Sequence, residues 1–583
     1  MHKMATFSHA NPNNKRNSIS LPIFFIINIF FLAPLAQAYS KNDAKPSQSH
    51  FSKFSASVNP DNNIDQPSIS STCKNIPHKA ACKSLLMSLK TTTTLPKNPK
   101  ELFDLSVQYS FKKVRSALEL ASTLGLSYQS KEQKTRLASD AMNDCIELLE
   151  DSLDQLSNIN SNNNNDNNNP IKSHSDIQTW LSAALTNQET CIQSLQETNK
   201  KVETGIMVST ARNLSHYISN SLAIFVSNHN TEDFINGRKL LSEDEFPSWV
   251  SPSERKLLEA SIGEIEAHAV VAKDGSGTHE TLAEAIDGVA RSLAGNGGGG
   301  RNVIYVKAGT YQENINIPTN QKNVMLVGDG KGKTVIVGSR NADNGWSTFQ
   351  SATVAAMGDG FIAKDITFVN SAGPSKHQAV ALRVGSDRSV IFRCSVEGYQ
   401  DSLYTHSKRQ FYRETDIYGT IDFIFGNSAV VFQNCNIFAR KASSGSKNYV
   451  TAQGRTDPNQ NTGISIHNCK IGSTSDASSS QVTYLGRPWQ KFSRTVIMQS
   501  FLDNSINPSG WSPWSGNFAL NTLFYAEYMN SGPGASTSGR VKWAGYRGIL
   551  TAAAAQAFTV GGFIDGNMWL PSTGVSFDSG LIG

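Results

Sequence analysis

Two aspartates in the second half of the chain are the residues best placed to do chemistry together. Asp401 and Asp422 lie 21 residues apart, and the sequence around them repeats with nearly the same step. If each repeat is one coil of a solenoid, the two positions are equivalent on neighbouring coils, with backbones about 4.8 Å apart. Carboxyl groups stacked in this way do not both ionise readily, so their apparent pKa values separate. The pair would then supply one carboxylate nucleophile or base and one carboxylic acid.

Polar residues near the pair favour catalysis over a structural role. Gln400 precedes Asp401 and Gln378 lies about one repeat earlier, so their amides could stabilise a developing oxyanion or simply stack as a ladder. A Leu-Gly-Arg-Pro-Trp segment contains Arg487, which could keep one carboxylate charged, and Trp489, which could stack on a sugar ring or belong to the core. The structural alternative for the two aspartates is a turn cap and a solvent-exposed side chain.

Other reaction chemistries are disfavoured by the sequence. It has no Gly-x-Ser-x-Gly nucleophile elbow, and His377 and His406 near the aspartates belong to no cluster with zinc-like spacing. The glycine-rich segment 295–300 lacks the Lys-Ser/Thr of a phosphate-binding loop. Tyr404 and Phe423 could line a groove, but each is equally compatible with ladder packing.

The elements that must position these residues are short strands in a repeating pattern. Segments around Cys394, Thr415, Cys435 and Cys469 can be superimposed with steps of 21, 20 and 34 residues. Each copy has an apolar or aromatic residue three positions earlier and an aliphatic residue two positions later. A period near 20 predicts a parallel β-helix, with an insertion in the 34-residue step. A β-sandwich is the rival fold, but it would show hairpin turns instead of a fixed offset.

The N-terminus has the layout of an export signal. Lys15 and Arg16 precede an apolar run over residues 21–35, and Ala36-Gln37-Ala38 offers a small-residue cleavage site. We therefore expect a signal peptide over 1–38, with a membrane anchor as the alternative, and a linker over 39–66. Export is compatible with disulfide bonds.

Residues 67–227 repeat apolar residues at spacings of three and four, which predicts an all-α bundle of about four helices. An asparagine tract over 161–169 must be a loop. The most economical disulfides are Cys73 with Cys82 and Cys145 with Cys191, although spacing leaves three connectivities open. Asn213 begins a glycosylation sequon.

The segment 228–262 is a polar linker that carries the sequence Arg-Lys-Leu-Leu twice, at 238–241 and at 255–258. The duplication favours processing sites over chance basic dipeptides. Residues 263–583 then form the β-helical domain.

The whole chain has 583 residues, 17% charged and 38% hydrophobic, with a net charge of +5. This composition excludes wholesale disorder and a multi-span membrane protein, and the mild basicity suits an acidic polymer but argues against nucleic acid.

Five ordered blocks give the second half a family resemblance. It resembles plant pectin methylesterases, and the whole chain resembles the form that carries an N-terminal pro-region similar to a pectin methylesterase inhibitor. The blocks are Gly309-Thr310-Tyr311-Gln312-Glu313, Gln378-Ala379-Val380-Ala381-Leu382, Gln400-Asp401-Ser402-Leu403-Tyr404, Asp422-Phe423-Ile424-Phe425-Gly426 and Leu485-Gly486-Arg487-Pro488-Trp489.

The resemblance implies a right-handed parallel β-helix that hydrolyses the C6 methyl ester of galacturonate in pectin without metal or cofactor. Asp422 would be the nucleophile and Asp401 the acid and then the base. The other implied roles are oxyanion stabilisation by Gln400, substrate binding by Thr348, Gln378 and Trp489, and a contact to both Asp422 and substrate by Arg487. The implied partners are pectin, a processing protease and an inhibitory bundle, intramolecular or separate, for a monomeric enzyme secreted to the cell wall.

Two positions depart from the family pattern. Members often carry a cysteine at the position of Thr415, bridged to that of Cys435, so Cys435 should here be a buried thiol. Ser402 stands where many members have threonine. Two alternatives stay open: a β-helical hydrolase or lyase that cuts the polysaccharide, because paired carboxylates also serve glycoside hydrolysis, and a non-catalytic inhibitor or wall-binding protein.

Overall fold

The structure is a computed structural model that describes residues 69–89, 96–127, 133–160, 173–198, 205–229, 266–293, 300–477 and 481–583. The predicted signal peptide, the linker 39–66, the asparagine tract and both Arg-Lys-Leu-Leu tetrads lie outside these residues. Among the described helices, none combines the length and the apolar character that crossing a bilayer requires.

The first half of the described chain is helical. Its helices are α1 (Ile69–Thr72), α2 (Lys79–Leu89), α3 (Pro99–Ser127), α4 (Gln133–Asn160), α5 (His174–Thr198) and α6 (Gly205–His229). Polar side chains define where two of them begin: Asn98 Oδ1 accepts the N–H of Glu101 at 2.8 Å before α3, and Ser173 Oγ accepts the N–H of Asp176 at 3.1 Å before α5. The all-α fold predicted from the spacing of apolar residues is confirmed.

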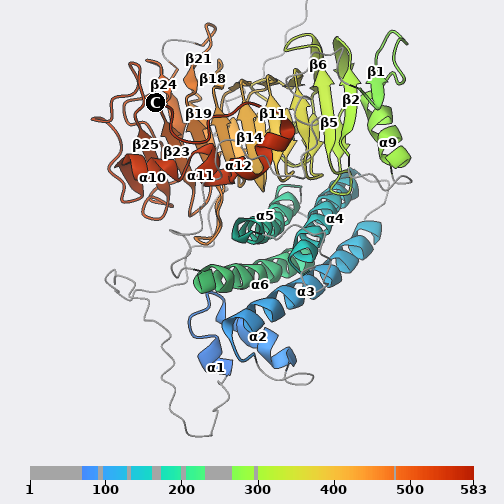
Figure 1. The fold of residues 1–583 in the computed structure, drawn as a ribbon, viewed down its shortest axis with the longest axis vertical. Helices are drawn as coiled ribbons and strands as arrows, with labels where there is room; N and C mark the ends of the chain where they lie inside the picture. The colour runs from blue at the N-terminus through green and yellow to red at the C-terminus, as the bar shows by residue number, and fades with distance from the viewer. Residues whose placement is uncertain are drawn as a thin grey trace, which may run out of the picture. The chain divides into compact units, whose positions relative to one another are not determined.

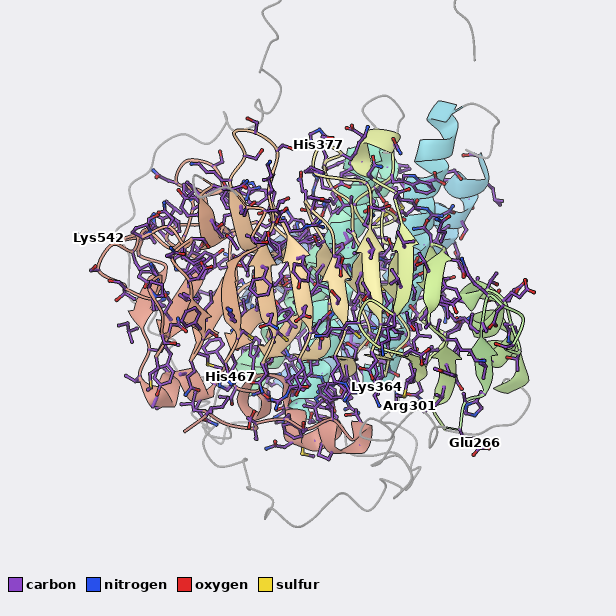
Figure 2. The ribbon with its side chains drawn as sticks, turned by 90° about the horizontal axis from the view of Figure 1, so that it is seen from above. Glu266, Arg301, Lys364, His377, His467 and Lys542 are labelled. Atoms are coloured by element: carbon purple, nitrogen blue, oxygen red, sulfur yellow. A yellow bond between two sulfur atoms is a disulfide. The ribbon has the colours of Figure 1, made fainter. Side chains whose placement is uncertain are left out.

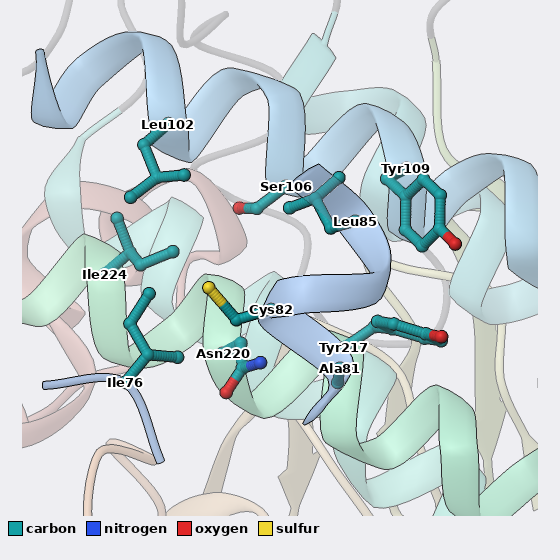
Figure 3. Close-up of a pocket in the computed structure, with 10 residues that line it drawn as sticks. All are labelled: Ile76, Ala81, Cys82, Leu85, Leu102, Ser106, Tyr109, Tyr217, Asn220 and Ile224. Carbon is teal, nitrogen blue, oxygen red and sulfur yellow. The ribbon is translucent and has the colours of Figure 1, made fainter. Parts of the chain in front are cut away.

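Two disulfides join parts of this bundle. Cys73 is bonded to Cys82 and Cys145 to Cys191, the pairing given above as the most economical. Helix α3 packs on α4 and α6, and α5 packs on the same two helices, so each long helix buries one apolar stripe. Figure 3 shows a cavity between α2, α3 and α6, lined by residues such as Leu85, Leu102 and Ile224. Its volume of about 10 Å³ is room for about one water molecule and carries no site.

Residues 269–549 form a parallel β-helix with three sheets, which confirms the predicted fold over the sandwich. Sheet A contains β1 (Ala269–Val271), β2 (Asn302–Val306), β5 (Val324–Gly328), β8 (Ile362–Lys364), β11 (Ser389–Phe392), β14 (Arg409–Arg413), β17 (Ala429–Gln433), β20 (Gly463–His467), β23 (Arg494–Met498), β25 (Phe524–Tyr528) and β26 (Tyr546–Ile549). Sheet B contains β3 (Gly309–Gln312), β6 (Thr334–Gly338), β9 (Thr367–Asn370), β12 (Ser395–Glu397), β15 (Asp416–Gly419), β18 (Asn436–Ala439), β21 (Lys470–Ser473) and β24 (Phe501–Leu502). Sheet C contains β4 (Ile315–Ile317), β7 (Val354–Ala356), β10 (Leu382–Val384), β13 (Leu403–Thr405), β16 (Ile424–Gly426), β19 (Asn448–Gln453) and β22 (Thr483–Gly486).

The turn from sheet A to sheet B explains the sequence repeat. The four superimposed positions each follow a strand of sheet A and each lie buried inside the coil. The residue before each of them has a left-handed backbone, namely Arg393 (φ 51°), Glu414 (φ 52°), Asn434 (φ 56°) and Asn468 (φ 53°). This conformation turns the chain sharply between two strands. The period seen in the sequence is therefore the number of residues in one coil of the β-helix.

The inside of the β-helix is apolar, and short helices close it. Helix α9 (Leu282–Leu293) places Leu282 and Ile286 in the interior cluster at the N-terminal end. Figure 1 shows α11 (Val560–Ile564) and α12 (Gly566–Trp569) along the strands of sheet A, near α10 (Ala552–Gln556). Two 3₁₀ turns lie at Ala342–Asn344 and Leu570–Thr573. Apolar residues of α11 and α12 pack on the outward face of sheet A, so the strands that they cover are not available to substrate.

The three cysteines of the β-helix are unbonded and buried. Cys435 therefore is a buried thiol, as expected, and its backbone N–H donates to Cys469 Sγ at 3.3 Å. Thr415 Oγ1 donates to the carbonyl oxygen of Ile391 at 3.1 Å. A hydroxyl thus takes the inward position that a cysteine occupies on neighbouring coils, and its polar atom is satisfied by the backbone.

Candidate active site

The two aspartates lie at equivalent places on neighbouring coils, just before strands of sheet C. The N–H of Asp401 donates to the carbonyl oxygen of Ile421 at 2.9 Å, and Leu403 pairs with Ile424 in the adjoining strands. Both aspartates have left-handed backbones, with φ of 63° and 52°. Such a conformation costs free energy in a residue other than glycine and is concentrated at functional sites.

Arg487 binds only one of the two carboxylates by a two-pronged contact. Its Nε lies 2.8 Å from Asp422 Oδ1 and its Nη2 lies 2.6 Å from Asp422 Oδ2. The Asp422 side chain is 7% exposed. Burial raises the pKa of Asp422, and the hydrogen bonds and charge of Arg487 oppose that rise. A bidentate guanidinium contact of this kind favours the ionised carboxylate.

Asp401 is in the opposite electrostatic situation. Its pKa lies well above the ordinary value because the group is buried, and the charges of Asp422 and Glu197 raise it further. Arg487 lowers it, but as the last of these causes. The two environments therefore favour the carboxylic acid at Asp401 and the carboxylate at Asp422, the division expected from two stacked carboxyl groups.

The remaining predicted site residues surround the pair. Gln400 is half-buried beside Asp401, and its carbonyl oxygen accepts the N–H of Ala379, the residue after Gln378, at 3.2 Å. The two glutamines therefore lie on neighbouring coils. Trp489 is half-buried and meets the ring of Phe425 edge-on, with centroids 5.9 Å apart.

A glycine on the coil before Trp489 allows this packing. A β-carbon added to Gly454 would lie 2.8 Å from the Trp489 ring, closer than side-chain atoms approach one another.

Thr348 precedes β7 and is buried. The structure thus brings Asp401, Asp422 and Arg487 together, with Gln400 next to Asp401 in the chain. Gln378 and Thr348 lie before strands β10 and β7 of sheet C, and Trp489 lies after β22.

The outward face of sheet C is also lined with aromatic rings. Tyr404 stacks on Phe425 with centroids 4.2 Å apart, and His406 meets Tyr404 edge-on at 5.2 Å. Phe423 instead points inward and belongs to the interior cluster. The sequence left Tyr404 and Phe423 undecided between groove and ladder. The 21-residue step from Tyr404 to Phe425 was the signal that would have separated them, since an outward column repeats with the coil.

Residues of the bundle contact this same face, and sequence reasoning missed them. Both carboxylate oxygens of Glu197 on α5 accept hydrogen bonds from Thr348, one from its N–H at 2.9 Å and one from its hydroxyl at 3.2 Å. Thr190 Oγ1 lies 3.0 Å from His406 Nε2. Burial lowers the pKa of His406, which favours the neutral imidazole. A neutral imidazole can still form the hydrogen bond with the Thr190 hydroxyl.

Buried ion pairs fasten the bundle beside the site. Lys408 Nζ contacts Asp151 of α4 at 2.7 Å and Asp359 at 2.9 Å. Arg409 contacts Asp176 of α5 and Asp387, both at 2.7 Å. A cavity of about 290 Å³ remains between α4 and the outward face of sheet C, with Glu147 and Arg383 in its lining. Nothing in the sequence spacing links the bundle residues to these cations, because Asp151 is 257 positions from Lys408 and Asp176 is 233 positions from Arg409.

Within the described ranges, no three histidine, cysteine, aspartate or glutamate residues gather as metal ligands would. Figure 2 shows two histidines of the β-helix well apart, with His377 at one margin and His467 near the opposite one.

Comparisons with known proteins agree with this geometry. Residues 268–567 match the family model "Pectinesterase", and residues 67–224 match "Plant invertase/pectin methylesterase inhibitor". A probable pectinesterase/pectinesterase inhibitor 35 from Arabidopsis thaliana is 56% identical over 99% of this chain and 100% of its own length. Pectinesterase 2 from Citrus sinensis is 49% identical over 88% of this chain and 95% of its own.

A solved structure resembles the β-helix. The pectin methylesterase from carrot is 56% identical, covers 54% of this chain and 99% of its own, and has a TM-score of 0.53. The relatives span the whole chain or the β-helix alone, and the paired carboxylates lie inside the matched region. The chain therefore belongs to the pectinesterase family, as a member that combines an inhibitor-like helical region with a pectinesterase β-helix.

Proposed function

We propose that this pectinesterase, which de-esterifies pectin, removes the C6 methyl esters of galacturonate through Asp422 as nucleophile and Asp401 as acid and base. The Asp422 carboxylate attacks the ester carbonyl carbon, and the carbonyl π electrons move to the oxygen. The amides of Gln400 and Gln378 donate hydrogen bonds to this oxyanion. As the intermediate collapses, the carbon–oxygen bond to methanol breaks and Asp401 transfers its proton to the departing oxygen.

The second half of the reaction restores both aspartates. Asp401 is now a carboxylate and takes a proton from a water molecule, which attacks the acyl carbon bound to Asp422. The acyl–oxygen bond to Asp422 breaks, which leaves the galacturonate acid and the Asp422 carboxylate, and Asp401 is protonated again. Each carboxyl group thus ends in the state in which it began.

The observation that carries this assignment is the unequal pairing of the two carboxyl groups. Arg487 makes two short contacts to Asp422, whereas burial and the charge of Asp422 raise the pKa of Asp401. An ionised nucleophile and a protonated acid are what ester hydrolysis through a covalent intermediate requires at its start. We assign substrate binding to Thr348, Gln378, Arg487 and Trp489 on the same face.

The test is methanol release from highly methylated pectin by the chain beginning at Glu259. Methanol should appear without shortening of the polymer, and Asp422→Asn should abolish it. Shortening of the polymer would favour the alternative of a hydrolase or lyase. If the Asp422→Asn variant has the same effect on the cell wall as the parent protein although it releases no methanol, the alternative of a non-catalytic wall-binding protein would be favoured.

We also propose that the helical bundle inhibits this site within the same chain. Glu197 accepts hydrogen bonds from the backbone N–H and the hydroxyl of Thr348, a residue assigned to substrate binding. In this proposal the chain divides into a pro-region over 67–227 and a catalytic domain over 263–583. A protease cuts one of the Arg-Lys-Leu-Leu tetrads between them.

We further propose that residues 1–38 direct secretion to the cell wall, where the enzyme acts as a monomer on pectin. Asn213 is exposed on α6, as a glycosylation acceptor must be. The full chain should release methanol more slowly than the chain that begins at Glu259. Equal rates would contradict inhibition by the bundle and leave the esterase assignment intact.

A further inference from the structure

We propose that Tyr449 and Trp514 are positioning residues that hold the guanidinium of Arg487 against Asp422. The inference rests on the proposed function, in which the Asp422 carboxylate must be ionised and correctly oriented. It adds two residues to the site that neither touch the carboxyl groups nor belong to any of the five sequence blocks.

The geometry of the contact is that of a cation held by aromatic rings. Arg487 Cζ lies 4.1 Å from the centroid of Tyr449 and 4.3 Å from the centroid of Trp514. The Arg487 side chain is 20% exposed. A cation within about 6 Å of a ring centroid is attracted to it, and the attraction grows as water is removed.

The three residues come together through the coil. Ile424 pairs with Thr451, so Tyr449 on β19 occupies the place on its coil that Asp422 occupies on the preceding one. The N–H of Arg487 donates to the carbonyl oxygen of Thr451 at 3.0 Å, which fixes the backbone from which the side chain starts. Its side chain therefore passes over the Tyr449 ring to reach Asp422.

Two further contacts support the rings. Tyr449 stacks on Tyr484 of the next coil, with centroids 5.7 Å apart and planes 15° from parallel. Trp514 follows Trp511, which forms a parallel bridge with Gly486, the residue before Arg487. Both rings are thus attached to the coils that carry Arg487 and Tyr449.

A positioning device is useful here because the arginine stem is flexible. The guanidinium forms two hydrogen bonds to Asp422 only if its plane coincides with that of the carboxylate, and each ring restricts that plane. The competing assignment is direct stacking of these rings on the sugar. A ring face that already lies 4.1 Å from a guanidinium carbon has no room for a sugar on that side, so the geometry favours positioning.

The experiment compares Tyr449→Leu and Trp514→Leu with Tyr449→Phe and Trp514→Phe in the chain beginning at Glu259. This part of the chain is suitable because it corresponds to a protein that folds without a bundle. The match to the carrot enzyme covers 99% of that chain, whose structure is solved. We expect each leucine variant to lower kcat by about tenfold and to change KM by less than about twofold. The phenylalanine variants, which keep a ring, should stay within about twofold of the parent kcat.

The pH profile gives a readout that a merely structural role would not move. If the guanidinium is no longer aligned, the pKa of Asp422 rises, so the acidic limb of kcat should shift to higher pH in the leucine variants. Arg487→Lys should shift the limb in the same direction, since an ammonium cannot make the two-pronged contact. A thermal melt of each variant shows that the β-helix is still folded.

Phe392→Leu is the matched control. Its ring lies 4.7 Å from Arg393 Cζ, and Arg393 contacts Asp365 through Nε at 2.9 Å and Nη2 at 2.6 Å, a similar arrangement away from sheet C. This variant should change neither kcat nor the acidic limb.

Each outcome decides one question. Leucine variants that raise KM and leave kcat and the acidic limb unchanged would overturn positioning and assign the rings to the sugar. If Asp422→Asn and Arg487→Lys also kept the parent kcat, the proposed function itself would be wrong, and this inference with it.

Discussion

Replacing Asp151 by asparagine should release the helical bundle from the β-helix. Lys408 is in contact with two carboxylates, Asp151 at 2.7 Å and Asp359 at 2.9 Å. The side chains of Lys408 and Asp151 are 0% exposed, and that of Asp359 is 22% exposed. The substitution keeps the shape of the side chain and removes one of the two negative charges that balance a fully buried ammonium group.

The size of the effect follows from this burial. Removing one partner of a buried ion pair costs about 3–5 kcal/mol. Asp359 remains in contact and balances part of the charge, so we expect a cost at or just below the lower end of that range, about 2–3 kcal/mol. When the bundle is released, Lys408 is hydrated and bears no such cost. The docking equilibrium should therefore shift by roughly 30- to 150-fold toward the released state.

Two measurements on the full chain test this prediction. Methanol release from methylated pectin should increase, and the amide of Thr348, which donates to Glu197, should exchange its hydrogen faster. Asp154→Asn is the control, because Asp154 lies one turn further along α4 and contacts Lys322 at 3.0 Å with side chains 29% and 41% exposed. An exposed pair contributes less than about 1 kcal/mol. Indistinguishable exchange in the two variants would refute the reasoning about buried charge, and faster exchange without faster methanol release would refute inhibition by the bundle.

Three more predictions concern the site and the bundle. Asp422→Asn should lower kcat at least about a thousandfold with little change in the melting temperature, since it removes the nucleophile but keeps its shape, and steady-state methanol release measures this. Burial raises the pKa of Asp144 on α4 to about 7, and the buried carboxyl contacts Ser347 of the β-helix. Because the docked state binds this proton more tightly, the contribution of Asp144 to docking should be fully present below about pH 4 and should be lost as pH rises through about 7. Asp144→Asn should flatten this dependence in hydrogen exchange measured as a function of pH. Removal of Cys145–Cys191, with a sequence separation of 46, should lower the stability of the bundle by about 4 kcal/mol in urea unfolding, against about 2.5 kcal/mol for Cys73–Cys82 with a separation of 9.

The coil and its carboxylate pair were predictable because they depend on a local period. In each of these coils a residue with a left-handed backbone follows the strand of sheet A, and the residue after it enters the interior. This interior position repeats in the sequence with a step of 20 or 21. That step alone places Asp401 beside Asp422. Arg487 was predicted as a partner from its chemistry and from the family resemblance, not from the period.

The contacts between the bundle and sheet C could not be predicted in the same way. Glu197 and Thr348 are 151 positions apart, and their contact depends on how two independently formed elements pack. Lys408 and Arg409 look like ordinary surface cations in the sequence, yet both are almost fully buried. Tyr449 has no distinguishing neighbour in the sequence, because its partner Arg487 comes from another coil.

The modular build of the β-helix separates the length of the binding surface from the chemistry performed on it. Within the three sheets, the strands of each coil pair with those of the coil before it and the coil after it. The two aspartates occupy consecutive coils near the middle of sheet C. Lengthening or trimming the stack at either end would alter how many sugar units the protein spans while the central pair stays in place. Evolution can thus tune the reach of such an enzyme along its polymer without rebuilding the reaction centre.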